Sequence, residues 1–369
     1  MKPAPKPYTI NPEPIRWSIV APVFAVLSVF VPVPAPIVES FYSQDMYPWL
    51  QNIFTGGTNF LPFAALDAIA IVIVIAVLFR IRRLYYVARQ RGIFDAIWEM
   101  ARRVARFAAI VTILFFWAWG FNYRRQPLEG QLPKGTVNRP TIDALQMAVI
   151  DGNALALRLR AQVMAGPALS FDQVADRLFV PLNTALKELR RPPLAREGRP
   201  KYSLVLTPFF TSAGVTGMIN PLALETIVHP DLLPFERPFV LAHEWAHLSG
   251  HADEAEASAI GWLACMRGGH ELAYSASIFL IDIASAAMPA DLRKEALKKL
   301  DAAVLTDLDA MTERRSAARP GVSRTTMRVY DEYLRANNVL DGGASYRRAL
   351  SFILAPKLRD ALANYTITR

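Results

Sequence analysis

The segment FVLAHEWAHLSG, residues 239–250, places two histidines four residues apart, with a glutamate directly after the first. Residues four apart lie on one face of a helix, so the imidazoles of His243 and His247 can point at one metal ion while Glu244 stands beside it. Neutral imidazoles bind zinc, and a carboxylate beside a zinc-held water can take a proton from that water. The spacing therefore predicts a zinc site that supports hydrolysis, with Glu244 as the catalytic base.

The flanking residues predict that this motif lies on a helix. Pro238 suits the first turn of a helix, and Gly250 stands where a C-terminal cap is expected. No helix breaker lies between Phe239 and Leu248.

A zinc ion held by two histidines needs a third protein ligand, and the stretch DEAEAS, residues 253–258, offers three carboxylates. If Asp253 is the N-cap of a second helix, Glu256 falls at its third position and completes a capping box. Glu254 is then free to point back at the histidines, and we expect it to be the third ligand. Glu256 and Asp253 are the alternatives. Asp253 also fits the metzincin spacing, but no downstream methionine stands in an evident turn of the kind that metzincins place beneath the metal.

The first third of the chain differs sharply in composition from the rest. Three apolar stretches, residues 17–38, 60–79 and 104–121, are each long enough to cross ~30 Å of hydrocarbon. They predict three transmembrane helices within a membrane anchor of residues 17–126, with the lipid bilayer as a partner. Asp67 lies inside the second stretch, where an acidic residue is either paired or hydrated near the interface and is a functional candidate by default.

Basic residues predict the orientation of this anchor. Eight arginines lie between Arg80 and Arg106, whereas residues 39–58 contain no lysine or arginine. Residues 1–16 are therefore expected to be a cytoplasmic tail, and residues 127–369 to lie outside. The chain has 41 basic and 32 acidic residues, a net charge of +9, and much of the excess belongs to this one connection. We accordingly predict no binding to nucleic acid.

Residues 127–369 predict a mostly helical soluble domain with a small β element. Residues 202–207 and 224–228 have the pattern of strands, and a strand pair before the metal helix either binds an extended peptide along its edge or only covers the core. The nearly continuous apolar stretch 271–288 is interpreted as a core helix because an aspartate and three serines interrupt it. Cys265 is the only cysteine, so no internal disulfide is possible, and we expect it to be buried.

Several blocks spread over nearly the whole chain stand out: GVTGMINP at 214–221, Glu225, HEWAHLSG at 243–250, EAEA at 254–257, YSA at 274–276, VYDEYL at 329–334 and GGASY at 342–346. Together they resemble an uncharacterised bacterial family of membrane-anchored zinc peptidases. The resemblance implies three membrane spans followed by a zincin-like, mostly helical domain. Together with the arginine distribution, these spans predict a multi-pass protein of the bacterial cytoplasmic (inner) membrane, with its catalytic domain on the extracytoplasmic side.

The block EAEAS, residues 254–258, is also similar to the E-x-x-A-D element of gluzincins, whose first glutamate binds zinc, and this implies Glu254 as a ligand. Ser258 replaces the aspartate that usually orients a histidine ligand, so that partner is expected to come from elsewhere. In many such enzymes a downstream tyrosine or histidine donates a hydrogen bond to the oxyanion. Tyr346 is our candidate for this role, Tyr330 and Arg347 are less favoured, and core packing is the structural alternative for Tyr346.

The sequence thus predicts a membrane-anchored zinc peptidase that hydrolyses peptide bonds of envelope proteins or peptides, with His243, His247 and Glu254 on Zn2+. The alternative is a noncatalytic metal-binding envelope protein that serves as a structural or partner-binding module. Glu244 disfavours this alternative because a purely structural site has no need of that carboxylate. A site of two imidazoles and one carboxylate also accepts other divalent metals.

Overall fold

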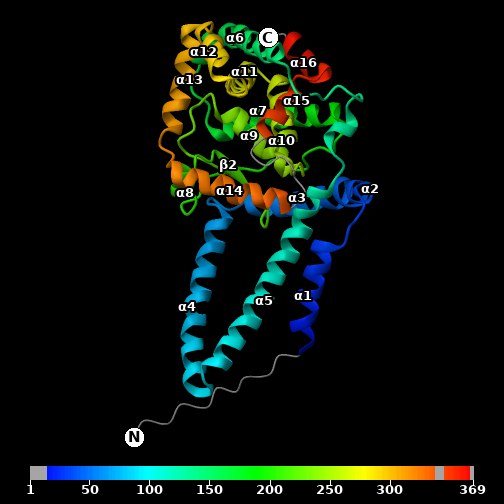
Figure 1. Ribbon diagram of the computed structural model, residues 1–369, viewed down its shortest axis with the longest axis vertical. Coiled ribbons are helices and arrows are strands. Elements are labelled where there is room, and N and C mark those ends of the chain that lie inside the picture. Colours follow the sequence, from blue (N-terminus) through cyan, green and yellow to red (C-terminus); the bar gives the residue numbers. More distant parts are fainter. Residues whose placement is uncertain (1–14, 337–344, 366–369) are drawn as a thin grey trace. The chain divides into compact units, whose positions relative to one another are not determined.

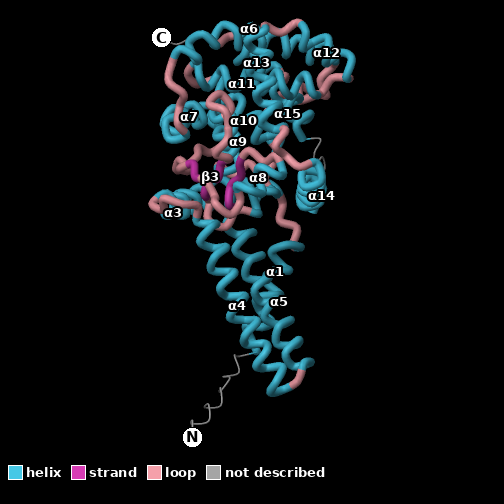
Figure 2. Tube along the Cα trace, turned by 90° about the vertical axis from the view of Figure 1, so that its left-hand side faces the viewer, coloured by secondary structure: helices cyan, strands magenta, loops and turns pink. Residues whose placement is uncertain are grey.

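The computed structural model describes residues 15–336 and 345–365, which form a mainly helical fold with one small sheet (Figures 1 and 2). The helices are α1 Ile15–Phe30, α2 Ala35–Ile37, η1 Val38–Met46, α3 Tyr47–Asn59, α4 Ala65–Arg91, α5 Ile93–Ala118, η2 Gly120–Arg124, η3 Leu128–Gln131, α6 Ile142–Ala165, α7 Phe171–Glu188, α8 Thr207–Ala213, α9 Arg237–Leu248, α10 Glu254–Met266, α11 His270–Ala286, α12 Ala290–Lys298, α13 Ala302–Arg315, α14 Pro320–Ala336, α15 Ser345–Ile353 and α16 Pro356–Ala363. The strands are β1 Pro200–Lys201, β2 Gly217–Asn220 and β3 Glu225–Val228. The predicted mainly α class with a small β element is confirmed.

The described chain divides into two compact units. Unit 1 contains the described residues up to Val33 and Ile71–Ala118. Unit 2 contains Pro34–Ala70 and the described residues from Trp119 onward. Residues 34–70 and 119–126 fall within the predicted membrane anchor, yet in the structure they belong to the same unit as the histidine motif.

Unit 1 consists of α1, most of α4 and α5. Helices α4 and α5 are joined at Gly92, which has a positive φ of 96°, so the predicted arginine-rich connection is largely helical rather than a loop. Helix α1 packs on α5, with the rings of Phe24 and Trp117 stacked at 6.1 Å. The large apolar residues of α4 between Ile71 and Phe79 are exposed.

Helix lengths in the described chain differ from the predicted spans. Helix α1 ends at Phe30, before the prolines of residues 32–36, which cannot donate the backbone hydrogen bonds of a continuing helix. The apolar part of α4 ends where the arginines begin at Arg80. Over residues 15–336 and 345–365, no single helix is both long and apolar enough to cross a membrane, although Val20–Phe30 and Ala35–Asn59 meet this requirement together as a bent pair.

The core of unit 2 is built around α9 and α10, most of whose residues are buried. Helix α10 packs on α9, α7 and α15, while α11 packs on α6. Helix α11 has a largely buried apolar surface, which confirms the core helix predicted over residues 271–288. Cys265 is fully buried in α10, as expected.

The sheet of unit 2 has the order β1-β3-β2, with β1 parallel and β2 antiparallel to β3. The strand predicted over residues 224–228 is confirmed by β3, whereas the strand predicted over residues 202–207 is wrong. The Asp67 carboxylate accepts hydrogen bonds from the backbone of Leu204 (2.8 Å) and from the Ser203 hydroxyl, which holds this segment in a turn before α8. Asp67 therefore has a structural role within unit 2.

Candidate metal centre

Helix α9 begins and ends where the sequence indicates. Pro238 occupies its first turn, and Gly250 adopts a positive φ of 88° just after its end. The backbone N–H of Gly250 donates to His247 O at 2.8 Å, and that of His251 donates to Ala246 O at 3.2 Å. These two bonds form a Schellman motif, which turns the chain back toward the histidines.

Helix α10 then places Glu254 in its first turn. Asp253 is the N-cap, and its carboxylate accepts hydrogen bonds from the backbone of Ala255 and Glu256, both at 3.0 Å. The predicted capping box is only half formed, because the Glu256 carboxylate instead accepts from Leu128 N at 2.6 Å. With Asp253 and Glu256 engaged in these contacts, Glu254 is the acidic side chain directed at the histidines.

Three ligand side chains converge between α9 and α10. His243 Nε2 lies 3.2 Å from Glu254 Oε2, His247 Nε2 lies 3.3 Å from Glu254 Oε1, and the two Nε2 atoms are 3.1 Å apart. Ligand atoms about 2.0–2.1 Å from a tetrahedral zinc ion are separated by roughly 3.3–3.4 Å. The donor types and spacings therefore fit a zinc-sized cation held by three protein ligands.

Both histidines have a partner on the nitrogen that faces away from this centre. His247 Nδ1 donates to His251 O at 2.7 Å, and His243 Nδ1 lies 3.3 Å from Ser258 Oγ. The carbonyl acceptor keeps the proton of His247 on Nδ1 and leaves its Nε2 for a metal, and the Ser258 hydroxyl is able to accept the corresponding hydrogen bond from His243. The expectation that the partner of a histidine must come from elsewhere than Ser258 is wrong, since the serine hydroxyl itself is within reach of His243.

Charges at the centre also favour a cation. Burial alone would lower the pKa of His247, but the adjacent Glu254 carboxylate raises that pKa to about 9. Burial would raise the pKa of Glu254, but the two histidines hold it well below its ordinary value. The carboxylate thus remains ionised and attracts positive charge, and a metal ion would compete with the proton for this place.

Glu244 lies on the same helix with its carboxyl group against β2. Burial raises the pKa of this carboxyl to about 6, although the two histidines act in the opposite direction. Among the described residues, no group donates a hydrogen bond to Glu244. A Cβ atom at Gly217 would lie only 2.9 Å from Glu244 Oε1, so the absence of a side chain at Gly217 makes room for the carboxyl group.

Strand β2 is an edge strand of the sheet, and its Gly217 lies beside this carboxyl group. The backbone N–H of His229 donates to Thr216 O at 2.9 Å, and hydrogen-bonded pairs alternate along an antiparallel ladder. By this register, Met218 and Asn220 bond to β3. The backbone N–H and C=O groups of Gly217 and Ile219 point away from β3.

The remaining histidines near the motif do not join the three ligand atoms. His251 is fully buried, with Nδ1 3.0 Å from Ser249 Oγ, and burial lowers its pKa well below the ordinary value. His270 is exposed in part and lies 3.5 Å from Glu271. The side chains of the oxyanion candidates Tyr346, Tyr330 and Arg347 lie outside the described part of the structure.

Three residues that hold the C-terminal end of α9 were not among the predicted site residues, because they lie in the predicted anchor, residues 17–126. Tyr47 Oη donates to Leu248 O at 2.8 Å, Trp119 Nε1 donates to His247 O at 3.3 Å, and Arg125 donates to Gly250 O at 2.8 Å. A tyrosine, a tryptophan and an arginine next to apolar stretches are a weak signal by themselves. Their role depends on contacts that are remote in sequence.

Gly261 allows α9 and α10 to pack closely, and it was not among the predicted site residues. A Cβ atom at Gly261 of α10 would lie 2.9 Å from His243 N. The missing side chain allows α10 to approach the backbone of α9 at the first histidine, which brings Ser258 and Glu254 close to that histidine.

The fold and this centre define a mainly helical protein with a cluster of two histidines and a glutamate that is able to hold a metal ion. The chain belongs to the family described as "Protein of unknown function (DUF3810)", whose family model matches residues 42–354. No curated protein matches the chain. No solved structure matches it either.

Proposed function

We propose that this chain is a zinc-dependent peptidase that hydrolyses peptide bonds of proteins or peptides in the cell envelope. The observation that supports this proposal most is the convergence of His243, His247 and Glu254 within zinc-ligand spacing, with Glu244 on the same helix beside an edge strand. Zinc bound by these three residues would polarise a peptide carbonyl group as a Lewis acid.

The chain's own residues supply the proton transfers. A pKa of about 6 leaves the Glu244 carboxyl mostly ionised at neutral pH, where it takes a proton from the attacking water and passes it to the leaving amine. Among the described residues no strand pairs with the outer side of β2, and this supports a role in substrate binding, because the outward backbone groups of Gly217 and Ile219 match those of an extended peptide. The peptide would then lie next to Glu244.

We also propose that the chain is anchored in the bacterial cytoplasmic membrane by spans within residues 17–38, 60–79 and 104–121, with the metal centre on the extracytoplasmic side. Support comes from the exposed apolar surface of α4 and from the arginines that follow it, which match the preference of basic residues for the cytoplasmic face. Zinc, a peptide substrate and the lipid bilayer are the proposed partners, and nucleic acid is not among them.

The test combines metal analysis with a peptidase assay on the detergent-purified full chain. We expect about one zinc ion per chain in the wild type and in Glu244→Gln, and a large loss in both His247→Ala and Glu254→Ala. A mixture of quenched fluorescent peptides should be cleaved by the wild type and not by Glu244→Gln. No metal in the wild type would contradict the proposal, and metal without hydrolysis in the wild type would favour the noncatalytic metal-binding alternative.

A further inference from the structure

Helix α3 directs its polar residues inward and its apolar residues outward. Its buried face carries Tyr47, Gln51 and Thr55, which donate hydrogen bonds to the backbone oxygens of Leu248 (2.8 Å), Arg196 (2.7 Å) and Leu224 (2.7 Å) respectively. Its outer face carries Trp49 and Ile53, which are 62% and 48% exposed. A helix on a water-facing surface has the opposite arrangement, so the surroundings of α3 are not water alone.

Exposed apolar side chains continue on both sides of α3. Phe60, directly after the helix, is 88% exposed, and Leu204, in the turn before α8, is 87% exposed. These segments are linked, because Lys201 donates to Thr58 O and the Asp67 carboxylate accepts from Leu204 N at 2.8 Å. Together Trp49, Ile53, Phe60 and Leu204 form what we call the apolar face of unit 2.

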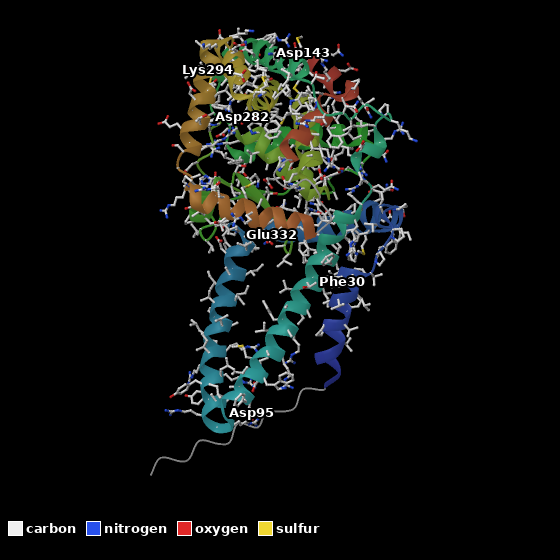
Figure 3. All side chains as sticks on the ribbon, in the orientation of Figure 1. Phe30, Asp95, Asp143, Asp282, Lys294 and Glu332 are labelled. Atoms are coloured by element: carbon white, nitrogen blue, oxygen red, sulfur yellow. The ribbon has the colours of Figure 1, made fainter. Side chains whose placement is uncertain are left out.

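This face contains very little charge. Residues 34–64 include only two charged side chains, of which Glu39 is buried, and residues 202–213 include none. Elsewhere in unit 2, charged side chains reach the surface: the exposed Asp143 and Lys294 lie on α6 and α12, at the end away from α3 (Figures 1 and 3). The low charge is therefore local to the apolar face.

We propose that the apolar face rests on the lipid bilayer, with α3 lying in the interface and its outer side chains inserted about 5–10 Å, to the boundary between headgroups and acyl chains. A bilayer fits better than a partner protein for two reasons. Tryptophan is enriched at the membrane interface, and tryptophan, phenylalanine and leucine are typical of the apolar face of helices that lie in that interface. The face is also continuous in sequence with α4, whose large apolar residues between Ile71 and Phe79 are exposed. This inference rests on the proposed membrane anchor and adds a second, peripheral contact.

Single-cysteine labelling can test this contact in the full chain. Cys265 is fully buried, so an introduced cysteine is the accessible thiol. Trp49→Cys, Ile53→Cys and Leu204→Cys each receive an environment-sensitive fluorophore. The protein is reconstituted in phosphatidylcholine and phosphatidylglycerol vesicles that carry nitroxide quenchers at a shallow or a deep position. Ile75→Cys on α4 reports on the anchor. Val180→Cys on α7, a 70% exposed apolar site remote from the face in sequence, is the control.

We expect shallow nitroxides to quench the three labels of the apolar face more than deep ones, deep nitroxides to quench the Ile75→Cys label, and neither to quench the Val180→Cys label. Lipid quenching at Ile75→Cys but not at the apolar face would overturn the docking and leave the anchor intact. A third outcome is that the labels on the apolar face are protected from a water-soluble quencher but are not quenched by lipid nitroxides. This outcome would assign the face to a protein partner and would also overturn the docking on lipid. Absence of quenching at Ile75→Cys would overturn the anchor and the docking together.

Discussion

Gly217 and Ser258 are neither proposed metal ligands nor the proposed base, but they affect the orientation of Glu244 and His243. Gly217 leaves the space that the Glu244 carboxyl occupies, and Ser258 supplies the hydroxyl beside His243 Nδ1. At both positions the proposed mechanism depends on orientation rather than on an additional reactive group. Each position therefore allows a substitution that separates positioning from metal binding.

Gly217→Ala should lower peptide hydrolysis and leave zinc content unchanged. The added Cβ would lie 2.9 Å from Glu244 Oε1, so the carboxyl group must move, and a displacement of about 1 Å at a catalytic group costs on the order of 100-fold in rate. The measurement is kcat/KM on the peptide mixture, with zinc content determined in parallel. Gly57→Ala, where no atom lies within 4 Å of the new Cβ, is the control. Full activity in Gly217→Ala would show that the position of Glu244 is not critical.

Ser258→Ala should weaken zinc binding. Removal of a hydrogen-bonding partner behind a metal-binding histidine typically costs about 10–100-fold in metal affinity, and Ser258→Asp should restore or exceed the original affinity because a carboxylate is the stronger acceptor. Competition with a zinc chelator gives the dissociation constants. Ser277→Ala, which removes another buried hydroxyl from α11, controls for general destabilisation. Equal affinity in Ser258→Ala and wild type would contradict a positioning role.

At the scale of elements, the ends of α9 and α10 are set by adjacent residues, whereas the conformation of segment 202–207 is set by a residue distant in sequence. Pro238, Gly250 and Asp253 mark the ends of these two helices by chemistry confined to a few adjacent residues, so the sequence alone located the helices and placed Glu254 opposite the histidines. The sequence of segment 202–207 has the pattern of a strand. However, the carboxylate of Asp67, distant in sequence, accepts hydrogen bonds from Leu204 N and the Ser203 hydroxyl and holds the segment in a turn. No local pattern reveals that competition.

The contact of Tyr47 with α9 could not be predicted either, because it also joins residues that are distant in sequence. Its hydroxyl donates to Leu248 O across a long separation in sequence, and it lies in a stretch whose composition resembles a membrane anchor. The proximity of His243, His247 and Glu254 could therefore be predicted from the sequence, whereas the residues that fix the end of α9 could not.

Tyr47→Phe should destabilise unit 2 and weaken zinc binding while the aromatic ring continues to fill its place. The change leaves the buried Leu248 carbonyl without this donor, which costs about 1–3 kcal/mol. Thermal unfolding of the detergent-purified chain, with and without added zinc, gives the shift. Tyr85→Phe on the exposed surface of α4 should behave as wild type. An unchanged unfolding midpoint for Tyr47→Phe would remove the support assigned to this hydrogen bond.

At the scale of the whole molecule, the chain enters unit 2 at Pro34, leaves it at Ala70 and returns at Trp119. A buried ion cluster joins the first of these segments to the later ones: Glu39 accepts from Arg125 at 2.8 Å and from Arg191 at 3.1 Å, and all three side chains are at most 6% exposed. Composition could identify the apolar stretches, but it could not show that the residues between them belong to the same unit as His243, His247 and Glu254. Glu39 and Arg125 follow the first and third apolar stretches closely, but their positions in the sequence do not show that they pair with each other.

This cluster predicts that the stability of unit 2 depends on pH in the acidic range. Burial alone would raise the pKa of Glu39, but Arg125 and Arg191 outweigh it and lower that pKa below its ordinary value of 4.5. A lowered pKa in the folded state means that the ionised carboxylate stabilises the fold fully above pH 4.5, and that this contribution is lost as the pH falls through the lowered value. At neutral pH, Glu39→Gln should cost about 3–5 kcal/mol, because it leaves two buried arginines without their acceptor.

The difference in unfolding free energy between wild type and Glu39→Gln should therefore be largest near neutral pH and should shrink as the pH falls below 4.5, since a protonated glutamate resembles glutamine. Thermal or denaturant unfolding in detergent, repeated across this range, measures it. Glu188→Gln removes a partly exposed ion pair with Arg267, which is worth about 0–1 kcal/mol, and provides the control for loss of a surface charge. A difference between wild type and Glu39→Gln that stays constant with pH would mean that shape rather than charge accounts for the effect. The ion cluster would then have no part in joining the segments of unit 2.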